Sequence, residues 1–148
     1  EEGHLRWDSL GEFLALAVSL EDFGRKTNNG KAMVLAKALN DAVGKMLDKD
    51  IAPGRAAHEL DNRGTHVCLA RYWAESLAEQ SDDAELKARF GKTAKQLVES
   101  EKAILAEIDA TAGKPQDIGG YYLPDPEKVS SAMRPSKTFN DIIASLDR

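Results

Sequence analysis

The chain has 148 residues, enough for one domain with a substantial core, and its 42% apolar and 30% charged residues are ordinary for a globular protein. Its 20 basic and 25 acidic residues give a formal net charge of −5. With no basic cluster to offset that charge, nucleic acid is not an expected partner. No apolar run reaches the length of a membrane span, so no membrane partner is expected. The single cysteine, Cys68, excludes an internal disulfide and is expected to be a small core residue.

The first predicted helix begins directly after the sequence "RWDS" and ends at Gly24. Ser9 and Glu12 have the spacing of a capping box, in which each side chain satisfies a backbone N–H at the helix start. A polar link then leads to a second predicted helix, from about Lys31 to Leu47, with a broad apolar face.

A long irregular segment, "DKDIAPGRAAHELDNRG", follows the second helix. Its Pro53-Gly54 pair is a turn signal, and such loops often carry binding groups. A third helix is predicted over about residues 65–79 and a fourth over about 84–111. The apolar stripe of the fourth helix has a gap between Leu97 and Ile104, which predicts that the helix is partly exposed or bent there.

The segment "GKPQDIGGYYLPDPEKV" contains three glycines and three prolines, so it is predicted to be a loop. Tyr121 and Tyr122 are expected to pack this loop against the rest of the protein. Asp125, placed before Pro126, predicts a short helix that runs to about Met133.

Ser136 is expected to cap the last helix, whose apolar stripe is Phe139, Ile142, Ile143 and Leu146. No convincing strand and no internal repeat is present. The predicted fold class is therefore all-α, an irregular bundle of about six helices with long loops that forms a single region over residues 1–148.

Few residues of the sequence indicate a catalytic or ligand-binding role. None of the three histidines has a metal-ligand partner at a convincing spacing, and HExxH, CxxC and Gly-rich phosphate-binding motifs are absent. Arg6 precedes a helix N-terminus, which favours anions, and Arg55 lies in the irregular loop. Because a guanidinium binds phosphate with paired donors, these two arginines are candidate anion ligands.

Each candidate also has a simpler interpretation. Arg6 and Arg55 could be surface arginines in ordinary ion pairs. Trp7 could be a core or interface aromatic residue, and Asp8 an ordinary helix cap. From the residues alone, both interpretations stay open.

Four segments together resemble the C-terminal end of the monomeric NADP-dependent isocitrate dehydrogenases. These segments are "EEGHLRWDSLGEFLALAVSLE", "HELDNRGTHVCLARYWAESLAEQ", "GKPQDIGGYYLPDPE" and "SSAMRPSKTFNDIIASL". The resemblance runs from Glu1 to Arg148, and the phrases "LRWDSLGEFLALA", "DNRG" and "AMRPSKTFN" are long and unusual. The stretch "DIAPGRAAH" is less typical of the family than its flanks.

The resemblance implies part of a much longer two-domain cytoplasmic enzyme of the tricarboxylic acid cycle and glyoxylate bypass. That enzyme oxidises and decarboxylates isocitrate to 2-oxoglutarate, using NADP and a divalent metal ion, Mg or Mn. By resemblance, Arg6, Trp7 and Asp8 contact the adenosine end of NADP, and Arg55 contacts its 2′-phosphate.

The family's isocitrate and metal ligands lie upstream of the segment that matches Glu1 and have no counterpart here, so no catalytic or metal-binding residue is assigned. This chain alone is therefore predicted to be inactive, with NADP and the upstream part of the enzyme as its partners. A homodimer is also expected, through residues 118–123 and the terminal stripe. The competing interpretation is a stand-alone helical binding or interaction module without catalysis.

Overall fold

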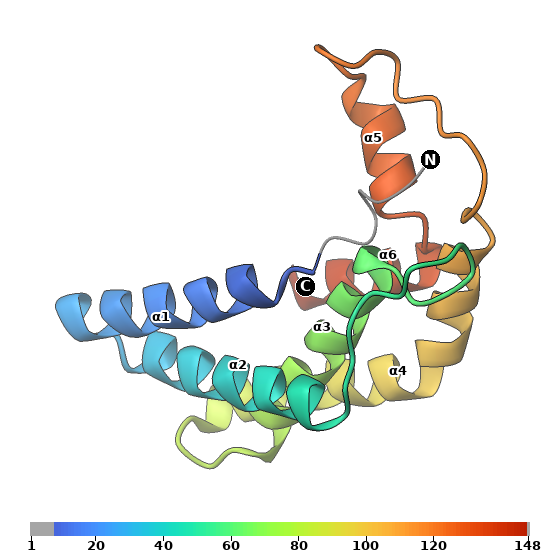
Figure 1. Ribbon diagram of the computed structural model, residues 1–148. Coiled ribbons are helices and arrows are strands. Elements are labelled where there is room, and N and C mark those ends of the chain that lie inside the picture. Colours follow the sequence, from blue (N-terminus) through green and yellow to red (C-terminus); the bar gives the residue numbers. More distant parts are fainter. Residues whose placement is uncertain (1–7, 148) are drawn as a thin grey trace.

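The computed structural model describes residues 8–147, and within this range the fold is built from α-helices and contains no strand. The helices are α1 (Leu10–Thr27), α2 (Gly30–Asp48), α3 (Asn62–Glu79), α4 (Ala84–Asp109), α5 (Pro126–Met133) and α6 (Lys137–Ala144), and a 3-10 turn follows over Ser145–Asp147. The predicted all-α class with about six helices is confirmed (Figure 1). None of the helices in the described range is long and apolar enough to cross a membrane.

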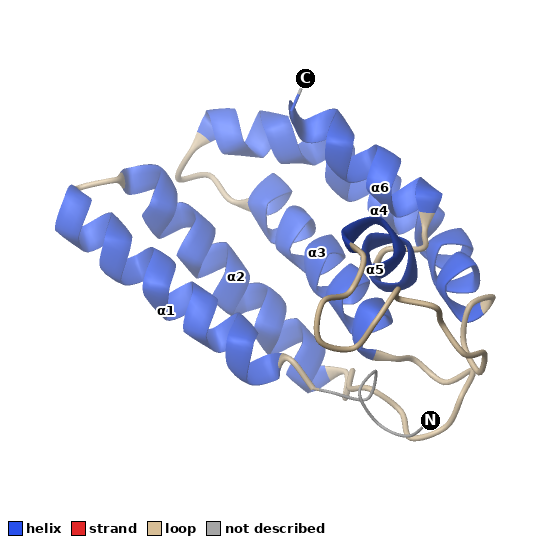
Figure 2. Ribbon diagram, turned by 90° about the horizontal axis from the view of Figure 1, so that it is seen from above, coloured by secondary structure: helices blue, strands red, loops and turns tan. Residues whose placement is uncertain are grey.

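The helices pack mainly on their neighbours in the chain. Contacts join α1 to α2, α2 to α3, α3 to α4, and α4 to α6, so the first four helices form a row (Figure 2). Helix α3 is central, because one of its faces packs on α1 and α2 and another on α4 and α6. One buried cluster lies on each side of α3. The first contains Phe13, Ala17, Leu39, Ala42, Val43, Met46, Cys68, Leu69 and Tyr72, and the second contains Val67, Ala74, Ala94, Leu97, Ile104, Ile108 and Ile142.

Cys68 lies in the first cluster and is 5% exposed, which confirms its prediction as a core residue. Burial raises the pKa of its thiol to about 11. The thiol is therefore neutral at physiological pH and behaves as a small apolar side chain.

The predicted end of the first helix was wrong. Helix α1 runs past Gly24 to Thr27 and ends at Asn28, at φ 53°, where the Gly24 carbonyl accepts the N–H groups of Asn28 and Asn29. Gly24 is buried, and a Cβ atom there would lie 2.7 Å from the sulfur of Met33. Close packing of α1 on α2 thus accounts for this glycine.

Helix α4 runs unbroken through the predicted gap in its apolar stripe. Glu99 and Lys102 are exposed there, so the predicted partial exposure is confirmed. Glu101 accepts a hydrogen bond from Arg71 of α3 at 2.6 Å, which adds a polar contact where the stripe is interrupted.

Residues 113–133, called here the arm, comprise the predicted loop and α5, and they stand away from the row of helices (Figure 1). The expectation that Tyr121 and Tyr122 pack the loop down was wrong, because their exposed fractions are 88% and 97%. The loop folds back on its own helix instead. The N–H of Asp125 donates to the Ile118 carbonyl at 2.7 Å, and Lys128 pairs with Asp117.

Helix α6 returns to the bundle. Ser136 accepts the N–H of Phe139 at 3.0 Å, which confirms the predicted cap, and Ile142 is buried against α4. The terminal stripe is therefore partly covered within the chain, although Ile143 remains 39% exposed.

Candidate functional site

Two of the four predicted site residues, Arg6 and Trp7, lie outside the described residues. Asp8 is described and exposed, and its Oδ1 accepts the N–H of Leu10 at 3.0 Å. The capping role predicted for Ser9 is wrong, since its side chain accepts no hydrogen bond from the helix start. Asp8 takes that role, as the simpler interpretation of this residue proposed.

Ser9 has another function. Its side chain is buried, and its Oγ accepts a hydrogen bond from Nδ2 of Asn62 at 2.8 Å. Asn62 is the first residue of α3 and follows the irregular loop over residues 51–61, called here the 51–61 loop. This bond joins the segment that follows Arg6 and Trp7 to the end of the loop that carries Arg55.

Glu59 shapes the 51–61 loop around Arg55. Its Oε2 accepts the backbone N–H groups of Arg55 and Ala56 at 2.6 and 2.9 Å. The N–H of Gly54 donates to the Leu60 carbonyl at 2.7 Å and closes the loop. Arg55 thus lies on a short turn with a fixed backbone.

Two further contacts hold the loop against the rest of the protein. His58 pairs with Asp109 at the end of α4, with 2.9 Å between Nδ1 and Oδ1. At the other end of the loop, Asp61 Oδ1 accepts the N–H of Gly64 at 3.1 Å and caps α3. This cap explains why α3 begins at Asn62, earlier than predicted.

Arg63 was missed by sequence reasoning, although it occupies the centre of a polar network. Its guanidinium is 3% exposed and binds Asp61 Oδ2 through two nitrogens, at 2.6 and 2.9 Å. A third nitrogen donates to Thr111 Oγ1 and to the Ala132 carbonyl, both at 2.9 Å. One buried side chain thus links the 51–61 loop, the end of α4 and the arm. The "DNRG" sequence is the only signal of this network, and it does not reveal the burial.

The side chain of Arg55 is exposed, and none of the described residues forms an ion pair or a hydrogen bond with its guanidinium. The simpler interpretation of Arg55, an ordinary surface ion pair, is therefore wrong within the described range. An exposed guanidinium on a fixed turn suits the binding of an anion.

The histidines in the described range have structural partners. Besides the His58 pair with Asp109, His66 Nδ1 lies 2.8 Å from the Asn62 carbonyl, and the His66 ring packs edge-on against Phe13. Between residues 8 and 147 no group of three histidine, cysteine or carboxylate side chains is placed to hold a metal ion.

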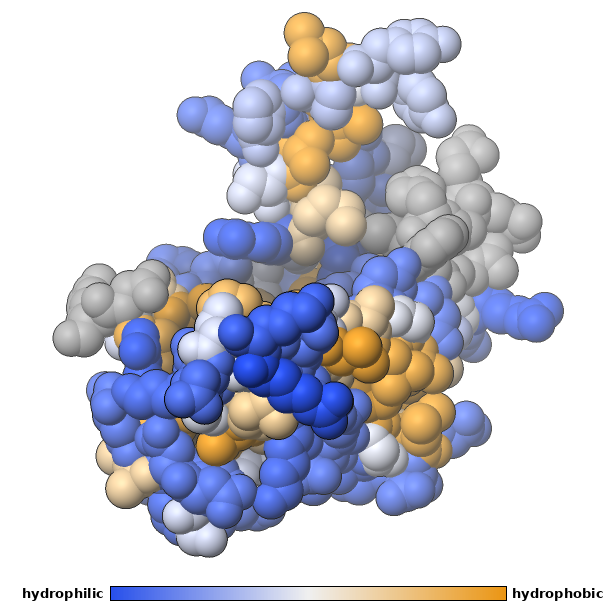
Figure 3. Space-filling view, turned by 90° about the vertical axis from the view of Figure 1, so that its left-hand side faces the viewer, coloured by the Kyte–Doolittle hydropathy of each residue, from blue (hydrophilic) through white to orange (hydrophobic). Residues whose placement is uncertain are grey.

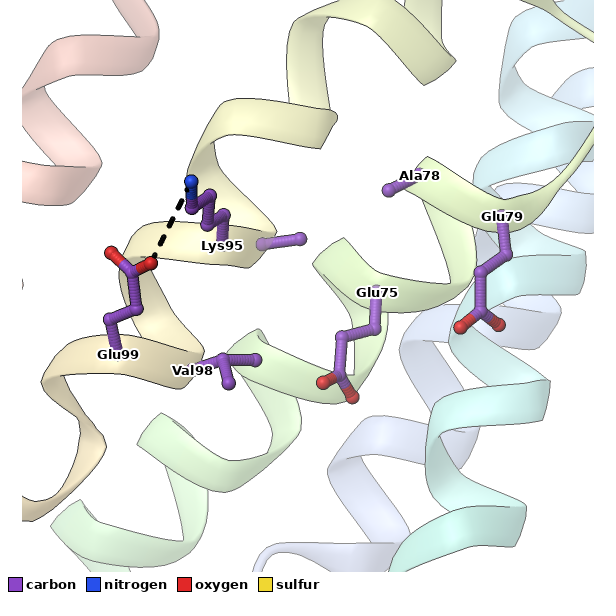
Figure 4. Close-up of a pocket in the computed structure, with 7 residues that line it drawn as sticks. Glu75, Ala78, Glu79, Lys95, Val98 and Glu99 are labelled. Atoms are coloured by element: carbon purple, nitrogen blue, oxygen red, sulfur yellow. Dashed lines mark ion pairs between the residues drawn. The ribbon is translucent and has the colours of Figure 1, made fainter.

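A groove of about 300 Å³ lies between α3 and α4 (Figure 4). Its lining residues are Glu75, Ala78, Glu79, Ala94, Lys95, Val98 and Glu99. Its three carboxylates outnumber its single cation, which disfavours a phosphate group. None of the predicted site residues lines it.

The profile of the family described as monomeric isocitrate dehydrogenase matches residues 1–144. The chain belongs to this family. It is 54% identical over 146 residues to isocitrate dehydrogenase (NADP) of Azotobacter vinelandii, an alignment that covers 99% of this chain and 20% of that relative. It is also 53% identical over 140 residues to isocitrate dehydrogenase (NADP) 2 of Mycobacterium tuberculosis, an alignment that covers 95% of this chain and 19% of that relative.

The relative from Corynebacterium glutamicum is 46% identical over all 148 residues, which make up 20% of its length. The chain therefore spans about a fifth of the curated relatives that it matches. The resemblance seen in the sequence is confirmed.

Proposed function

We propose that this chain is the C-terminal NADP-contacting region of an enzyme that oxidises and decarboxylates isocitrate to 2-oxoglutarate. The relatives that it matches are named as NADP-dependent isocitrate dehydrogenases. The single observation that carries the proposal is the Ser9–Asn62 hydrogen bond. This bond joins Ser9, which follows Asp8, to Asn62, which follows the loop that carries Arg55, and so supports a common site for two segments that lie far apart in the sequence.

The proposed chemistry is recognition of the phosphorylated adenosine. The Arg55 guanidinium, exposed and without a described partner, binds the 2′-phosphate with paired donors, and Arg6 contributes a second cation. Trp7 and Asp8 contact the adenosine. Since NAD lacks the 2′-phosphate, the two arginines favour NADP over NAD.

The proposal assigns the isocitrate ligands and the Mg or Mn ligands to the remaining polypeptide of the longer enzyme. No described cluster in this chain fits a metal ion, and Asp61 and Asp125 are used as helix caps. Catalysis needs substrate, metal and cofactor groups preorganised together, so this chain alone does not turn over isocitrate. We further propose that the whole enzyme is cytoplasmic and acts in the tricarboxylic acid cycle and the glyoxylate bypass.

Nucleotide binding to the isolated chain tests the proposal. We expect weak, salt-sensitive binding of NADP and poorer binding of NAD, measured by titration calorimetry and by Trp7 fluorescence. Each well-formed arginine–phosphate contact contributes about 1.5–3 kcal/mol, part of which is lost to ordering an open surface. The variants Arg6→Ala and Arg55→Ala should reduce the preference for NADP.

Arg25→Ala is the matched control, because Arg25 is an exposed arginine near the far end of α1 and pairs with Glu21. Equal affinities for NADP and NAD, or an Arg6→Ala, Arg55→Ala double variant that binds NADP as well as the wild type, would contradict the proposal.

A second proposal concerns self-association, which is what the alternative function, a helical interaction module, would require. The tip of the arm presents Tyr121, Tyr122 and Leu123, with exposed fractions of 88%, 97% and 90%. Exposed apolar clusters of this kind mark interaction surfaces. We propose that the isolated chain forms a two-fold homodimer through this tip.

A further inference from the structure

The carboxylate of Glu59 lies on the backbone of the turn that carries Arg55. Its Oε2 receives the N–H groups of two successive residues, Arg55 and Ala56, at 2.6 and 2.9 Å. A charged acceptor makes each of these bonds stronger than a bond between neutral groups. The backbone orientation of Arg55 therefore depends directly on this one side chain.

The neighbouring residues leave space for that carboxylate. A Cβ atom at Gly54 would lie 2.4 Å from Glu59 Oε2 and 2.5 Å from Glu59 Cβ, so only glycine permits this approach. His58 adopts the left-handed conformation, at φ 68°, which is uncommon for a non-glycine residue. A close approach at Gly54 and an unusual backbone angle at His58 thus flank the position at which Glu59 meets the Arg55 amide.

The Glu59 carboxylate and the Arg55 guanidinium do not form an ion pair with each other, although they belong to one turn. Glu59 instead binds the backbone N–H of Arg55. This arrangement orders the residue without neutralising its side chain, and the cation remains available for a phosphate.

We propose that Glu59 is a positioning residue for NADP recognition, which fixes the backbone at Arg55 before the nucleotide arrives. This inference rests on the proposed function of Arg55. A turn that is ordered in advance avoids part of the entropy cost of binding. The benefit is confined to the contact that Arg55 makes, so it applies to the 2′-phosphate of NADP and not to NAD.

The test compares nucleotide binding by Glu59→Ala, Glu59→Gln and Arg55→Ala variants of the complete 148-residue chain. Glu59→Ala should weaken NADP binding about five- to tenfold, because a loose turn must be ordered on binding, and should leave NAD binding unchanged. Glu59→Gln keeps an acceptor oxygen and should restore most of the NADP affinity. Glu99→Ala, at an exposed glutamate of α4 that pairs with Lys95, is the matched control and should have no effect.

A second measurement requires no bound nucleotide. Hydrogen exchange of the Arg55 and Ala56 amides should accelerate in Glu59→Ala, while amides in α3 exchange as in the wild type. Unchanged exchange at Arg55 and Ala56 would overturn the inference, whatever the binding data show.

The outcomes separate this inference from the proposed function. If Arg55→Ala lowers the NADP affinity and Glu59→Ala does not, the positioning role is wrong and the proposed function stands. If Glu59→Ala weakens NADP and NAD equally, Glu59 has only a general structural role, and the inference also fails. If Arg55→Ala changes nothing, the proposed function fails at that residue and the inference fails with it.

Discussion

The 51–61 loop and the arm are built by the same local chemistry, yet they have different surroundings. In the loop, Glu59 accepts two backbone N–H groups, and in the arm, Asp125 accepts the N–H groups of Glu127 and Lys128. The loop is also held to the bundle along its length, through the His58–Asp109 pair and the Asp61–Arg63 pair.

Among the residues that the structure describes, no comparable contacts hold the arm along its length. Helix α5 buries none of its residues. The hydrogen bonds that the arm forms with the rest of the described chain lie near its ends, as in the Ala132 carbonyl that accepts from Arg63. The arm consequently projects from the body of the molecule with apolar side chains at its tip (Figure 3). Carboxylate–amide bonds thus determine the shape of a loop, whereas long-range contacts determine whether it lies on the bundle or away from it.

Arg63 contacts both regions, so its removal should have the largest effect. Arg63→Ala removes a buried guanidinium and leaves the partly buried Asp61 carboxylate without its cationic partner, and breaking a buried ion pair in this way costs about 3–5 kcal/mol. Urea unfolding followed by circular dichroism measures the loss, and amide exchange should increase in both the loop and the arm. Arg25→Ala, at an exposed ion pair, should cost less than about 1 kcal/mol. A small loss in Arg63→Ala would show that the two regions are held independently.

The arm tip should control association and not stability. Replacing Tyr121, Tyr122 and Leu123 with serine should abolish the homodimer, while the free energy of unfolding of the monomer changes by less than about 0.5 kcal/mol, because these side chains are almost fully exposed. Light scattering across a concentration series reports the association. A wild-type chain that stays monomeric at every concentration would contradict the dimer proposal, and a less stable triple variant would mean that the tip packs within the chain.

Glu107 holds a third segment, the start of α6, through hydrogen bonds to its carboxylate. We expect its substitution to have the smallest effect on stability. Hydrogen bonds from Ser136 and Thr138 lower the pKa of Glu107. A lowered folded-state pKa means that the stabilisation is present above the ordinary glutamate pKa of about 4.3 and is lost as pH falls through the folded-state value. Unfolding measured over this acidic range should therefore show a shallower loss of stability in Glu107→Gln than in the wild type. If the free energy of unfolding falls equally steeply with pH in both proteins, protonation of Glu107 does not weaken the docking of α6.

Most features that depend on nearby residues could be predicted from the sequence, although the local cap at Asp61 was missed. The caps at Asp125 and Ser136 were predicted correctly, because each needs only a side chain and an N–H a few residues away. The helices themselves followed from apolar spacing. The family was recognised from long, unusual phrases, which is a different kind of information from periodicity.

Features that depend on distant partners were not readable. Ser9 looked like a cap, but its hydroxyl accepts a hydrogen bond from Asn62. Gly24 looked like a helix end, but it lies within α1, where it packs closely against Met33. The burial of Arg63 depends on three segments that meet only in the folded chain. For the candidate site, the sequence singled out Arg55, whereas the role of Glu59 became visible only from the loop geometry.

The buried thiol of Cys68 is a built-in probe of how often the core opens. Cys68 is the single cysteine of the chain, its thiol is 5% exposed, and burial holds the thiol pKa near 11. A thiol-labelling reagent needs an accessible thiolate, so it reacts only with molecules in which the core between α1, α2 and α3 has opened. The labelling rate therefore measures how often this core opens, without any substitution in the protein. A nucleotide bound near the start of α1 would slow that rate without contacting the sulfur.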